Sequence, residues 1–505
     1  MSLNYNFIWL LCYLLVLVGL AGYGFHRLSI VYLYWKNRNN KPQPKARFQE
    51  LPVVTVQLPM FNEKFVVDRL LESVAALDYP QDKLEIQILD DSTDDTTEQC
   101  YRKVEELKSR GFDAVCIHRT DRTGFKAAAL EAATKVAKGE FLLILDADFV
   151  PEPDLLQKTI HFFTDENVGL VQTRWGHINR EYNLLTRIQG MYLDGHFAME
   201  QTARNRSGRF FTFNGTAGIW RKCVIGDAGG WSHDTLTEDM DLSYRVQLKG
   251  WRFIYLNDVV TPAELPVDMD GFKSQQHRWT KGSIQVCQKI LLDIWRSNAP
   301  LKAKVEATTH LTCNYSYLLL ALLCFLVYPI CTQRIPENET VFMWFVNVAL
   351  FFMTSVAVCI FYMSAQIVVR PKSWWKELPY LPLLLTLSVG MAVNNAKAVL
   401  EAIFGHQSAF VRTPKYGVDR KEARRHVSQL KRNGYRAIKS VVIPVLEIAC
   451  GTFFLNLIII MIRQGHYLSP ILMIPFLGFY YTGFCSLGRM ISNLLPAKQT
   501  AKAKN

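Results

Sequence analysis

Five stretches of this 505-residue chain are apolar and long enough to cross a lipid bilayer as helices. A spanning helix needs about 20 mainly apolar residues, because its backbone polar groups must be satisfied within the helix. The sequence predicts transmembrane helices in three regions: one helix in residues 1–36, two in 311–369 and two in 437–492. The chain is therefore expected to be an integral membrane protein with one large soluble domain.

The distribution of charge sets the expected orientation. Lys and Arg are retained on the cytoplasmic side of spanning helices, and the basic linker 37–50 follows the first apolar run, whereas residues 1–6 are uncharged. Residues 51–270 hold 24 Lys and Arg against 35 Asp and Glu, while the rest of the chain holds 33 against 10. We expect a large acidic soluble domain in the cytosol. Nucleic acid is excluded as a partner, because the basic excess lies beside the apolar runs.

A further apolar segment, residues 378–405, contains two prolines near its start and three polar residues in its middle. If it crossed the bilayer, the basic loop 406–436 and the Lys-rich tail 493–505 would both face outward. We therefore expect five spans, with 378–405 as an interfacial or re-entrant helix, and six spans remain the alternative. Residues 275–296 have apolar positions at helical spacing, which predicts an amphipathic helix on the membrane surface.

Residues 51–274 read as an α/β domain in which strand-like and helix-like stretches alternate. This alternation predicts a mainly parallel sheet with helices on both faces. Ligands in such folds bind outside the carboxyl ends of the strands. The predicted strands cover residues 53–58, 85–89, 114–118, 141–145 and 168–173.

Carboxylates follow three of these strands. Glu63 follows the first, Asp90 and Asp91 follow the second, and Asp146 and Asp148 follow the fourth. Such a cluster repels itself, and a hard divalent cation such as Mg²⁺ or Mn²⁺ would relieve the repulsion. A lone D-x-D pattern is more often a solvated turn, but its register with two other strand ends favours a binding site.

Three further patterns supply chemistry. Lys126 stands at the start of a predicted helix, where backbone N–H groups suit a diphosphate. Asp239 ends a T-E-D pattern, and a carboxylate in such a site can deprotonate a hydroxyl group. In a Q-x-x-R-W pattern, Arg278 offers planar donors to phosphate oxygens and Trp279 an aromatic face to a sugar.

The ordered patterns D, D-x-D, T-E-D and Q-x-x-R-W resemble those of processive family-2 glycosyltransferases of the cellulose synthase-like type. The resemblance covers about residues 51–300, and it is closest to the plant cellulose synthase-like A and C groups and their bacterial relatives. The sequence segments that carry the resemblance to the A and C groups are LPMFNE at 58–63, LDDSTD at 89–94, FNGTAG at 213–218 and EDMDL at 238–242. The resemblance implies a GT-A fold inserted between transmembrane helices.

It also implies an activity: inverting transfer of a hexose from UDP-glucose or GDP-mannose to a growing β-linked, 1,4-type glycan. Asp146 and Asp148 would lie at the divalent cation, with Asp148 the direct ligand. Asp239, beside Glu238 in the catalytic set, would be the general base, and Trp279 would stack on the acceptor sugar. The implied nucleotide-sugar site comprises Glu63, Asp90, Asp91, Lys126, Gln275 and Arg278.

Residues 410–415, FVRTPK, resemble the F-x-V-T-x-K gating-loop motif of cellulose synthases, with the Val shifted by one position. Several alternatives stay open at this point. The enzyme could instead transfer one or a few sugars to a lipid acceptor, and it could act with a second copy or an accessory export partner. A non-catalytic scaffold is disfavoured because every motif residue is present. The host membrane is either a bacterial plasma membrane or the Golgi.

Overall fold

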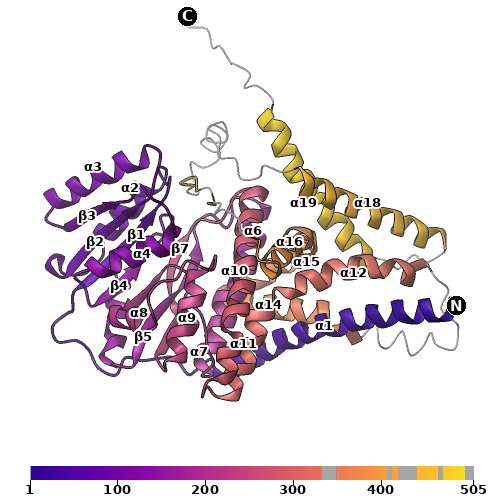
Figure 1. The fold of residues 1–505 in the computed structure, drawn as a ribbon, viewed down its shortest axis with the longest axis horizontal. Coiled ribbons are helices and arrows are strands. Elements are labelled where there is room, and N and C mark those ends of the chain that lie inside the picture. The colour runs from indigo at the N-terminus through magenta and orange to yellow at the C-terminus, as the bar shows by residue number, and fades with distance from the viewer. Residues whose placement is uncertain are drawn as a thin grey trace, which may run out of the picture.

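In this computed structural model, an α/β domain adjoins a set of long helices (Figure 1). The chain enters through helix α1, Ser2–Asn37, forms the α/β domain, and then returns to the helical part. The structure describes residues 2–332, 349–350, 352–406, 412–413, 415–418, 441–464 and 470–494.

Seven strands form one sheet in the order β3-β2-β1-β4-β6-β5-β7. Only β6 runs antiparallel to its neighbours, β4 and β5; all other pairs are parallel. Because β1, β2 and β4 are parallel neighbours, the residues that follow them meet at one edge. The strands are β1 Val54–Met60, β2 Leu84–Asp90, β3 Asp113–His118, β4 Phe141–Ile144, β5 Val168–His177, β6 Gly218–Arg221 and β7 Arg252–Ala263.

Each of the five sequence-based strands overlaps β1 to β5, but β6 and β7 have no counterpart among them. β6 has only four residues, and β7 contains Asn257, Asp258 and Pro262, which break an apolar strand pattern. The GT-A type of α/β fold expected from the sequence is nevertheless the one observed, with a mostly parallel sheet.

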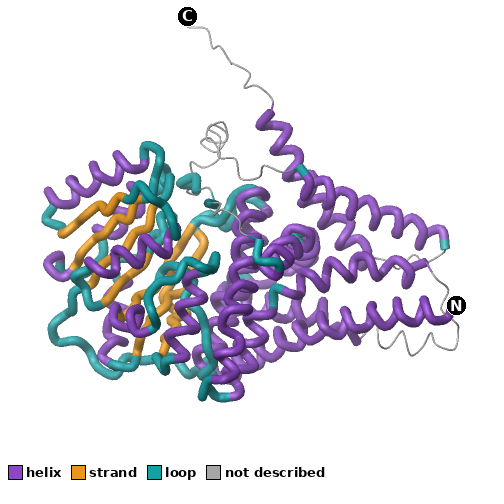
Figure 2. Tube along the Cα trace, viewed as in Figure 1, coloured by secondary structure: helices purple, strands orange, loops and turns teal. Residues whose placement is uncertain are grey.

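Helices cover both faces of the sheet (Figure 2). On one face α2, Val67–Ala75, and α3, Thr96–Ser109, pack their apolar sides over β1 and β2. On the other face α4, Phe125–Val136, α8, Lys222–Asp227, and α9, Glu238–Leu248, pack around the buried Trp220. Burial of these apolar stripes is the main favourable contribution to the stability of the domain.

The remaining helical elements connect the sheet to the apolar part of the chain. They are η1 Gln81–Lys83, α5 Leu155–Thr159, η2 Ile160–Thr164, α6 Leu184–Asp194, η3 Gly195–Gln201, α7 Thr202–Arg206, α10 Met269–Arg296, α11 Leu301–Thr312, α12 Tyr315–Thr332, η4 Phe352–Val356, α14 Ala357–Val369, η5 Trp374–Tyr380, α15 Leu381–Gly390, α16 Ala392–Ile403, α18 Val442–Arg463 and α19 Pro470–Leu494.

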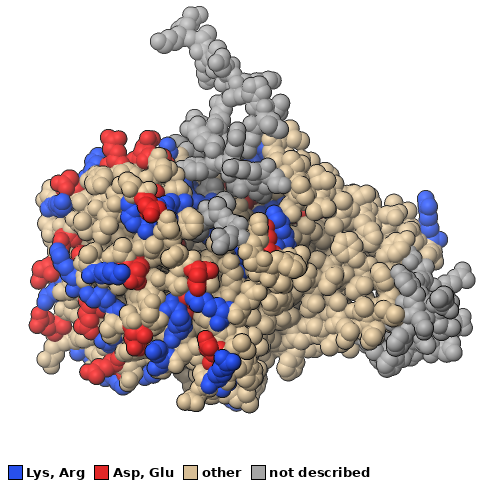
Figure 3. Space-filling view, in the orientation of Figure 1, with Lys and Arg blue, Asp and Glu red and all other residues tan. Residues whose placement is uncertain are grey.

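Within the part of the chain that the structure describes, two helices, α1 and α18, are by themselves long and apolar enough to cross a membrane. Two bent pairs pass the same test together: α11 with α12, bent by 53°, and the 374–390 segment with α16, bent by 41°. Charged side chains gather over the α/β domain and are sparse over the long helices (Figure 3). These helices fit a membrane protein.

The expectation of five spans stays a prediction. A bent pair over 374–403 is compatible with both a re-entrant helix and a broken sixth span. Outside the described residues lie residues 341–348 and 351 of the expected third span, most of the basic loop 406–436, all of the tail 493–505 after Leu494, and residues 410–411 and 414 of the gating-loop motif.

Helix α10 contains the whole segment predicted to be amphipathic, and it begins six residues earlier. The side chain of Asp268 caps it by accepting a hydrogen bond from the Gly271 N–H at 2.9 Å. Residues spaced by three or four positions share one face of a helix. Gln275, Arg278 and Trp279 therefore point together from α10 toward the edge of the sheet.

Candidate active site

A cavity of about 190 Å³ lies at the carboxyl edge of β1, β2 and β4. It brings together segments that are far apart in the chain, including the start of α9 and the middle of α10. All the predicted site residues except Asp90 line it: Glu63, Asp91, Lys126, Asp146, Asp148, Glu238, Asp239, Gln275, Arg278 and Trp279.

The adjacent carboxylates at the end of β2 point to different places. Asp90 is fully buried away from the cavity, where it accepts a hydrogen bond from Thr97 Oγ1 at 2.7 Å and lies 2.7 Å from His118 Nδ1. Asp91 lines the cavity and is held by the Arg119 guanidinium at 2.8 and 2.5 Å. Of the two, only Asp91 is placed to contact a ligand.

Lys126 lies in the first turn of α4 and joins two of the motifs. Its ammonium donates to Asp146 Oδ1 at 2.6 Å and to the carbonyl oxygen of Gly215 at 2.7 Å. Burial alone would lower the pKa of Lys126, but the surrounding carboxylates, Asp146 foremost, raise it overall. The cavity therefore contains a lysine that stays charged.

Asp148 and Glu63 are each paired with a cation from the C-terminal part of the chain. Lys415 Nζ lies 2.5 Å from Asp148 Oδ2, and Arg412 donates to both oxygens of Glu63 at 2.9 and 2.7 Å. Burial raises the pKa of Glu63 to about 7, although Arg412 acts in the opposite direction. In the sequence these two cations belong to the basic loop used to infer the membrane topology, and only the fold places them in the cavity.

Residues 415–418 are fixed in place by polar contacts with the α/β domain. The backbone N–H groups of Tyr416 and Val418 both donate to the Glu264 carboxylate, at 3.3 and 2.9 Å. Arg69 holds the same carboxylate at 2.7 Å. Gly417 has φ of 65°, and a Cβ there would lie 2.6 Å from the Phe65 carbonyl oxygen, so a side chain would push this segment away.

Asp239 lies in the first turn of α9 with an unusual electrostatic environment. Burial raises its pKa to about 7, and the neighbouring charge of Glu238 adds to the shift. A carboxylate with a pKa near neutrality suits proton transfer at physiological pH. Arg278 remains cationic, because burial lowers its pKa while Glu238, Asp146 and Asp239 oppose that shift.

The T-E-D and Q-x-x-R-W motifs meet because α10 approaches α9 closely. A Cβ on Gly282 would lie 2.5 Å from Thr237 Cγ2, so only glycine allows this distance without movement. Gly282 lies one turn beyond Arg278 on the helix. The glycine thus sets the separation between Asp239 and Arg278, and the sequence patterns do not reveal it.

An aromatic wall forms one side of the cavity. Trp175 lies at the end of β5. Its ring centroid is 6.5 Å from that of Trp279, in an edge-to-face arrangement, and 4.6 Å from that of Phe197, on which it stacks. Aromatic faces are suited to the apolar faces of sugar rings. Trp175 was not among the sequence-based candidates; its position at the carboxyl end of a strand is the signal that could have indicated it.

The described part of the chain contains no group of three or more His, Cys, Asp or Glu side chains that could hold a metal ion. Asp146 and Asp148 nevertheless fit a cation that is also bound by substrate phosphates, because Mg²⁺ commonly takes only one or two carboxylates from the protein. Asp148 Oδ1 is buried without a hydrogen-bond partner, and its Oδ2 already holds the Lys415 ammonium. The donor set is therefore suited to a hard divalent cation.

Comparisons with known proteins agree with this geometry. Residues 52–282 match the family described as "Glycosyltransferase like family 2". Glucomannan 4-beta-mannosyltransferase 2 of Arabidopsis thaliana is 41% identical over 286 residues, which is 54% of this chain and 53% of that protein. Glucomannan 4-beta-mannosyltransferase 1 of Oryza sativa subsp. japonica is 40% identical over 277 residues, with the same coverage. The chain spans about half the length of the curated relatives it matches.

Among solved structures, a mannosyltransferase from Pyrobaculum calidifontis, PcManGT, in complex with GDP-Man and Mn²⁺, shares the fold. The TM-score is 0.56 and the identity 20%, and the match covers 78% of this chain and 100% of that one. At this identity the likeness concerns the fold alone.

Proposed function

Because residues 52–282 form a family-2 glycosyltransferase domain, we propose that this chain is an inverting hexosyltransferase that extends a β-linked glycan at a membrane. One observation carries the proposal. A single cavity gathers a carboxylate of near-neutral pKa, two carboxylates after β4, and the Arg and Trp of α10. These are the groups needed to activate a hydroxyl, hold a diphosphate and position a sugar.

In the proposed reaction, Asp239 accepts the proton of an acceptor hydroxyl while that oxygen attacks the anomeric carbon of the donor. The bond from this carbon to the nucleoside diphosphate breaks in the same step, so an α-linked donor gives a β-linked product. Arg278 and Lys126 stabilise the negative charge that develops on the leaving diphosphate. A divalent cation held by Asp146 and Asp148 would neutralise part of that charge.

The remaining lining residues divide between donor and acceptor in this proposal. Glu63 and Asp91 face the nucleoside, Gln275 assists at the diphosphate, and Trp279 with Trp175 holds the acceptor sugar. Lys415 neutralises the charge of Asp148, so a divalent cation bound at Asp148 would have to displace the Lys415 ammonium. Binding of a donor with its cation would thereby change the position of Lys415.

We propose GDP-mannose as the first donor to test and UDP-glucose as the second. The names of the two plant relatives, both glucomannan 4-beta-mannosyltransferases, support this order and a 1,4 linkage. The proposed setting is a Golgi or bacterial plasma membrane with the catalytic domain in the cytosol. A second copy or an export partner is part of the proposal only for the release of a long product.

The deciding experiment uses the purified full chain reconstituted in lipid. Radiolabelled GDP-mannose and UDP-glucose are supplied separately with Mg²⁺ or Mn²⁺, and products are sized and digested with linkage-specific glycanases. We expect a glycan that a β-1,4-specific enzyme digests. Asp239→Asn should abolish transfer, while Asp113→Asn, an exposed carboxylate at β3, should not. Label found only in an organic extract would mean a lipid acceptor, and no transfer from either donor would contradict the proposal.

A further inference from the structure

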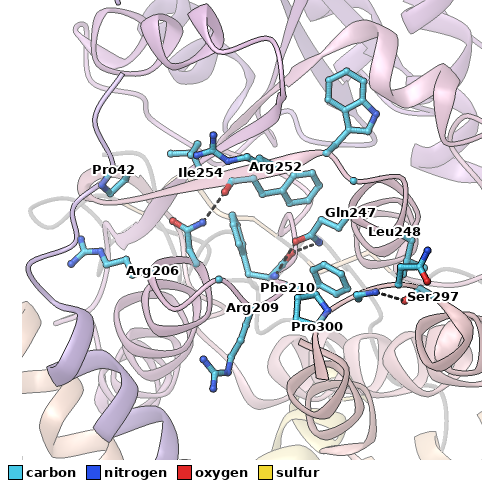
Figure 4. A pocket seen from close by; sticks show the side chains of 18 of the residues that line it. Pro42, Arg206, Arg209, Phe210, Gln247, Leu248, Arg252, Ile254, Ser297 and Pro300 are labelled. Atoms are coloured by element: carbon cyan, nitrogen blue, oxygen red, sulfur yellow. Dashed lines mark hydrogen bonds between the residues drawn. The ribbon is translucent and has the colours of Figure 1, made fainter. Parts of the chain in front are cut away.

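A second and larger groove, of about 680 Å³, lies on the catalytic domain and shares no lining residue with the catalytic cavity. Its walls come from five segments: the linker after α1, the α7 end and the residues that follow it, the end of α9, the start of β7, and the turn between α10 and α11. Figure 4 shows three arginines around the groove: Arg206 and Arg209 extend in different directions, and Arg252 lies above them.

The groove is positively charged. Its lining includes Arg206, Arg209 and Arg252 but no Asp or Glu. Arg252 is paired with Asp165 at 2.5 Å. Within the described ranges no carboxylate lies within 4.0 Å of the other two arginines: Arg206 donates to the carbonyl oxygen of Arg38, and Arg209 reaches only the Ser207 carbonyl oxygen at 3.5 Å.

A third cation without a carboxylate partner stands at the rim. Lys302, at the start of α11, donates to the Ser207 carbonyl oxygen at 2.9 Å, and its ammonium would lie 3.1 Å from a Cβ on Gly208. Arg206 Nε is buried and has no hydrogen-bond partner among the described atoms. A donor left without an acceptor in a cationic groove indicates a site for an oxyanion.

The groove also lies where the chain leaves and re-enters the apolar helices. On the α1 side Tyr32 and Trp35 are exposed, with the Arg38 guanidinium over the Trp35 ring at 5.0 Å. On the other side Trp295 is 45% exposed and Leu301 67% exposed. Exposed Trp and Tyr beside Lys and Arg mark the headgroup level of a bilayer, since their rings are amphipathic.

We propose that this groove binds the phosphate group of an anionic phospholipid. Arg206, Arg209 and Lys302 would supply the positive charge that attracts the phosphate oxygens, and Phe210 with Pro300 would face the apolar start of the lipid. Basic groups at the cytoplasmic surface attract anionic lipids in this way. Gln247 and Asn205 only shape the groove, because their amides are already bonded to backbone groups.

The test is native mass spectrometry of the detergent-solubilised full chain, titrated with phosphatidylglycerol, phosphatidylcholine or inorganic phosphate. Arg206→Gln with Arg209→Gln should weaken phosphatidylglycerol binding about 30-fold, or about fivefold for each cation removed. Lys135→Gln with Lys158→Gln removes the same charge from exposed lysines elsewhere on the domain and should leave binding unchanged.

Three outcomes would overturn the inference: equal binding of the two lipids, no effect of the Arg206 and Arg209 substitutions, or retention of inorganic phosphate in place of the lipid, which would assign the groove to a free phosphate. If the Gln variant does not fold, Arg206→Lys with Arg209→Lys keeps the charge. That pair should retain phosphatidylglycerol binding, because an ammonium still attracts the anion, and loss of binding would contradict the electrostatic explanation.

Discussion

At the residue scale, the environment of Asp239 carries most of the chemistry that we propose. An exposed aspartate is ionised throughout the physiological range and is a weak base. Burial and Glu238 raise the pKa of Asp239 to about 7, so its proton affinity approaches that needed to accept a proton from a polarised hydroxyl. The same burial leaves Asp239 dependent on Lys126 and Arg278 to balance the cavity charge.

The first prediction concerns pH. The base must be deprotonated to act, so kcat/KM, which reports the free enzyme, should rise with pH up to about 7 and then level off. Below that point it should fall about tenfold per pH unit. Glu63 has a pKa in the same range, so the control is the Glu63→Gln variant. In this variant kcat/KM should still fall below pH 7 if Asp239 causes the fall. If kcat/KM no longer falls, the titrating group is Glu63.

The second prediction concerns Lys415 and Asp148. Lys415→Met removes an ammonium that lies 2.5 Å from the Asp148 carboxylate. In the unmodified protein, Mn²⁺ must displace this ammonium and break its hydrogen bond to a charged group. Mn²⁺ should therefore bind roughly tenfold more tightly or better to the variant. Isothermal titration with Mn²⁺ and a nucleoside diphosphate measures this. Lys138→Met, which frees the exposed Asp113, is the matched control. Unchanged Mn²⁺ affinity in Lys415→Met would mean that the cation does not bind at Asp148.

At the element scale, α10 connects the catalytic cavity to the apolar helices. Its face with Gln275, Arg278 and Trp279 lines the cavity, while Lys273 on the same helix donates to Glu447 of α18 at 2.5 Å. Both partners of this ion pair are almost completely buried. The Lys273 ammonium also reaches Thr482 and Ser486 of α19. The position of α10, and with it the catalytic site, therefore depends on the last two helices.

The third prediction follows from that ion pair. Lys273→Met leaves the Glu447 carboxylate buried without its partner, which should cost about 3–5 kcal/mol of stability. The measurement is thermal unfolding of the protein in detergent. Adding Glu447→Leu should restore most of the loss, because replacing both charges removes the uncompensated one. If Lys273→Met alone is as stable as the unmodified protein, water or another group must reach Glu447.

At the scale of the whole molecule, the chain folds back on itself. Arg412, Lys415 and Val418 follow several apolar helices in sequence, yet they contact Glu63, Asp148 and Glu264 of the domain that precedes those helices. The C-terminal half thus completes the rim of a cavity built by the N-terminal half. We therefore predict an even number of membrane crossings between the two.

The fourth prediction is topological. In sealed vesicles, proteolytic sites introduced at residues 412–436 should be cleaved from the same side as the catalytic domain, because Arg412 and Lys415 lie in its cavity. A site introduced after Lys108, on the exposed end of α3, provides the reference side. Cleavage from opposite sides would favour six spans in the alternative topology.

The sequence by itself determined the fold class and most of the site. Alternating apolar runs specify a parallel sheet, and parallel strands place the residues after β1, β2 and β4 at one edge, so Glu63, Asp90, Asp91, Asp146 and Asp148 could be grouped from local patterns. The resemblance of the T-E-D and Q-x-x-R-W motifs to those of family-2 glycosyltransferases added Asp239, Arg278 and Trp279 to the predicted site. The first inference depends on short-range periodicity and on one rule of sheet geometry, and the second depends on motif likeness.

Tertiary structure alone decided the rest. It separated Asp90 from Asp91, because neighbouring residues at a strand end point in different directions and only one can face the cavity. It placed Arg412 and Lys415 against carboxylates almost 350 and 270 positions earlier, a pairing that no local pattern encodes. It added Trp175 and the close approach at Gly282, and it formed the cationic groove around Arg206 from five segments. Contacts between distant segments depend on how elements pack, which periodicity does not specify.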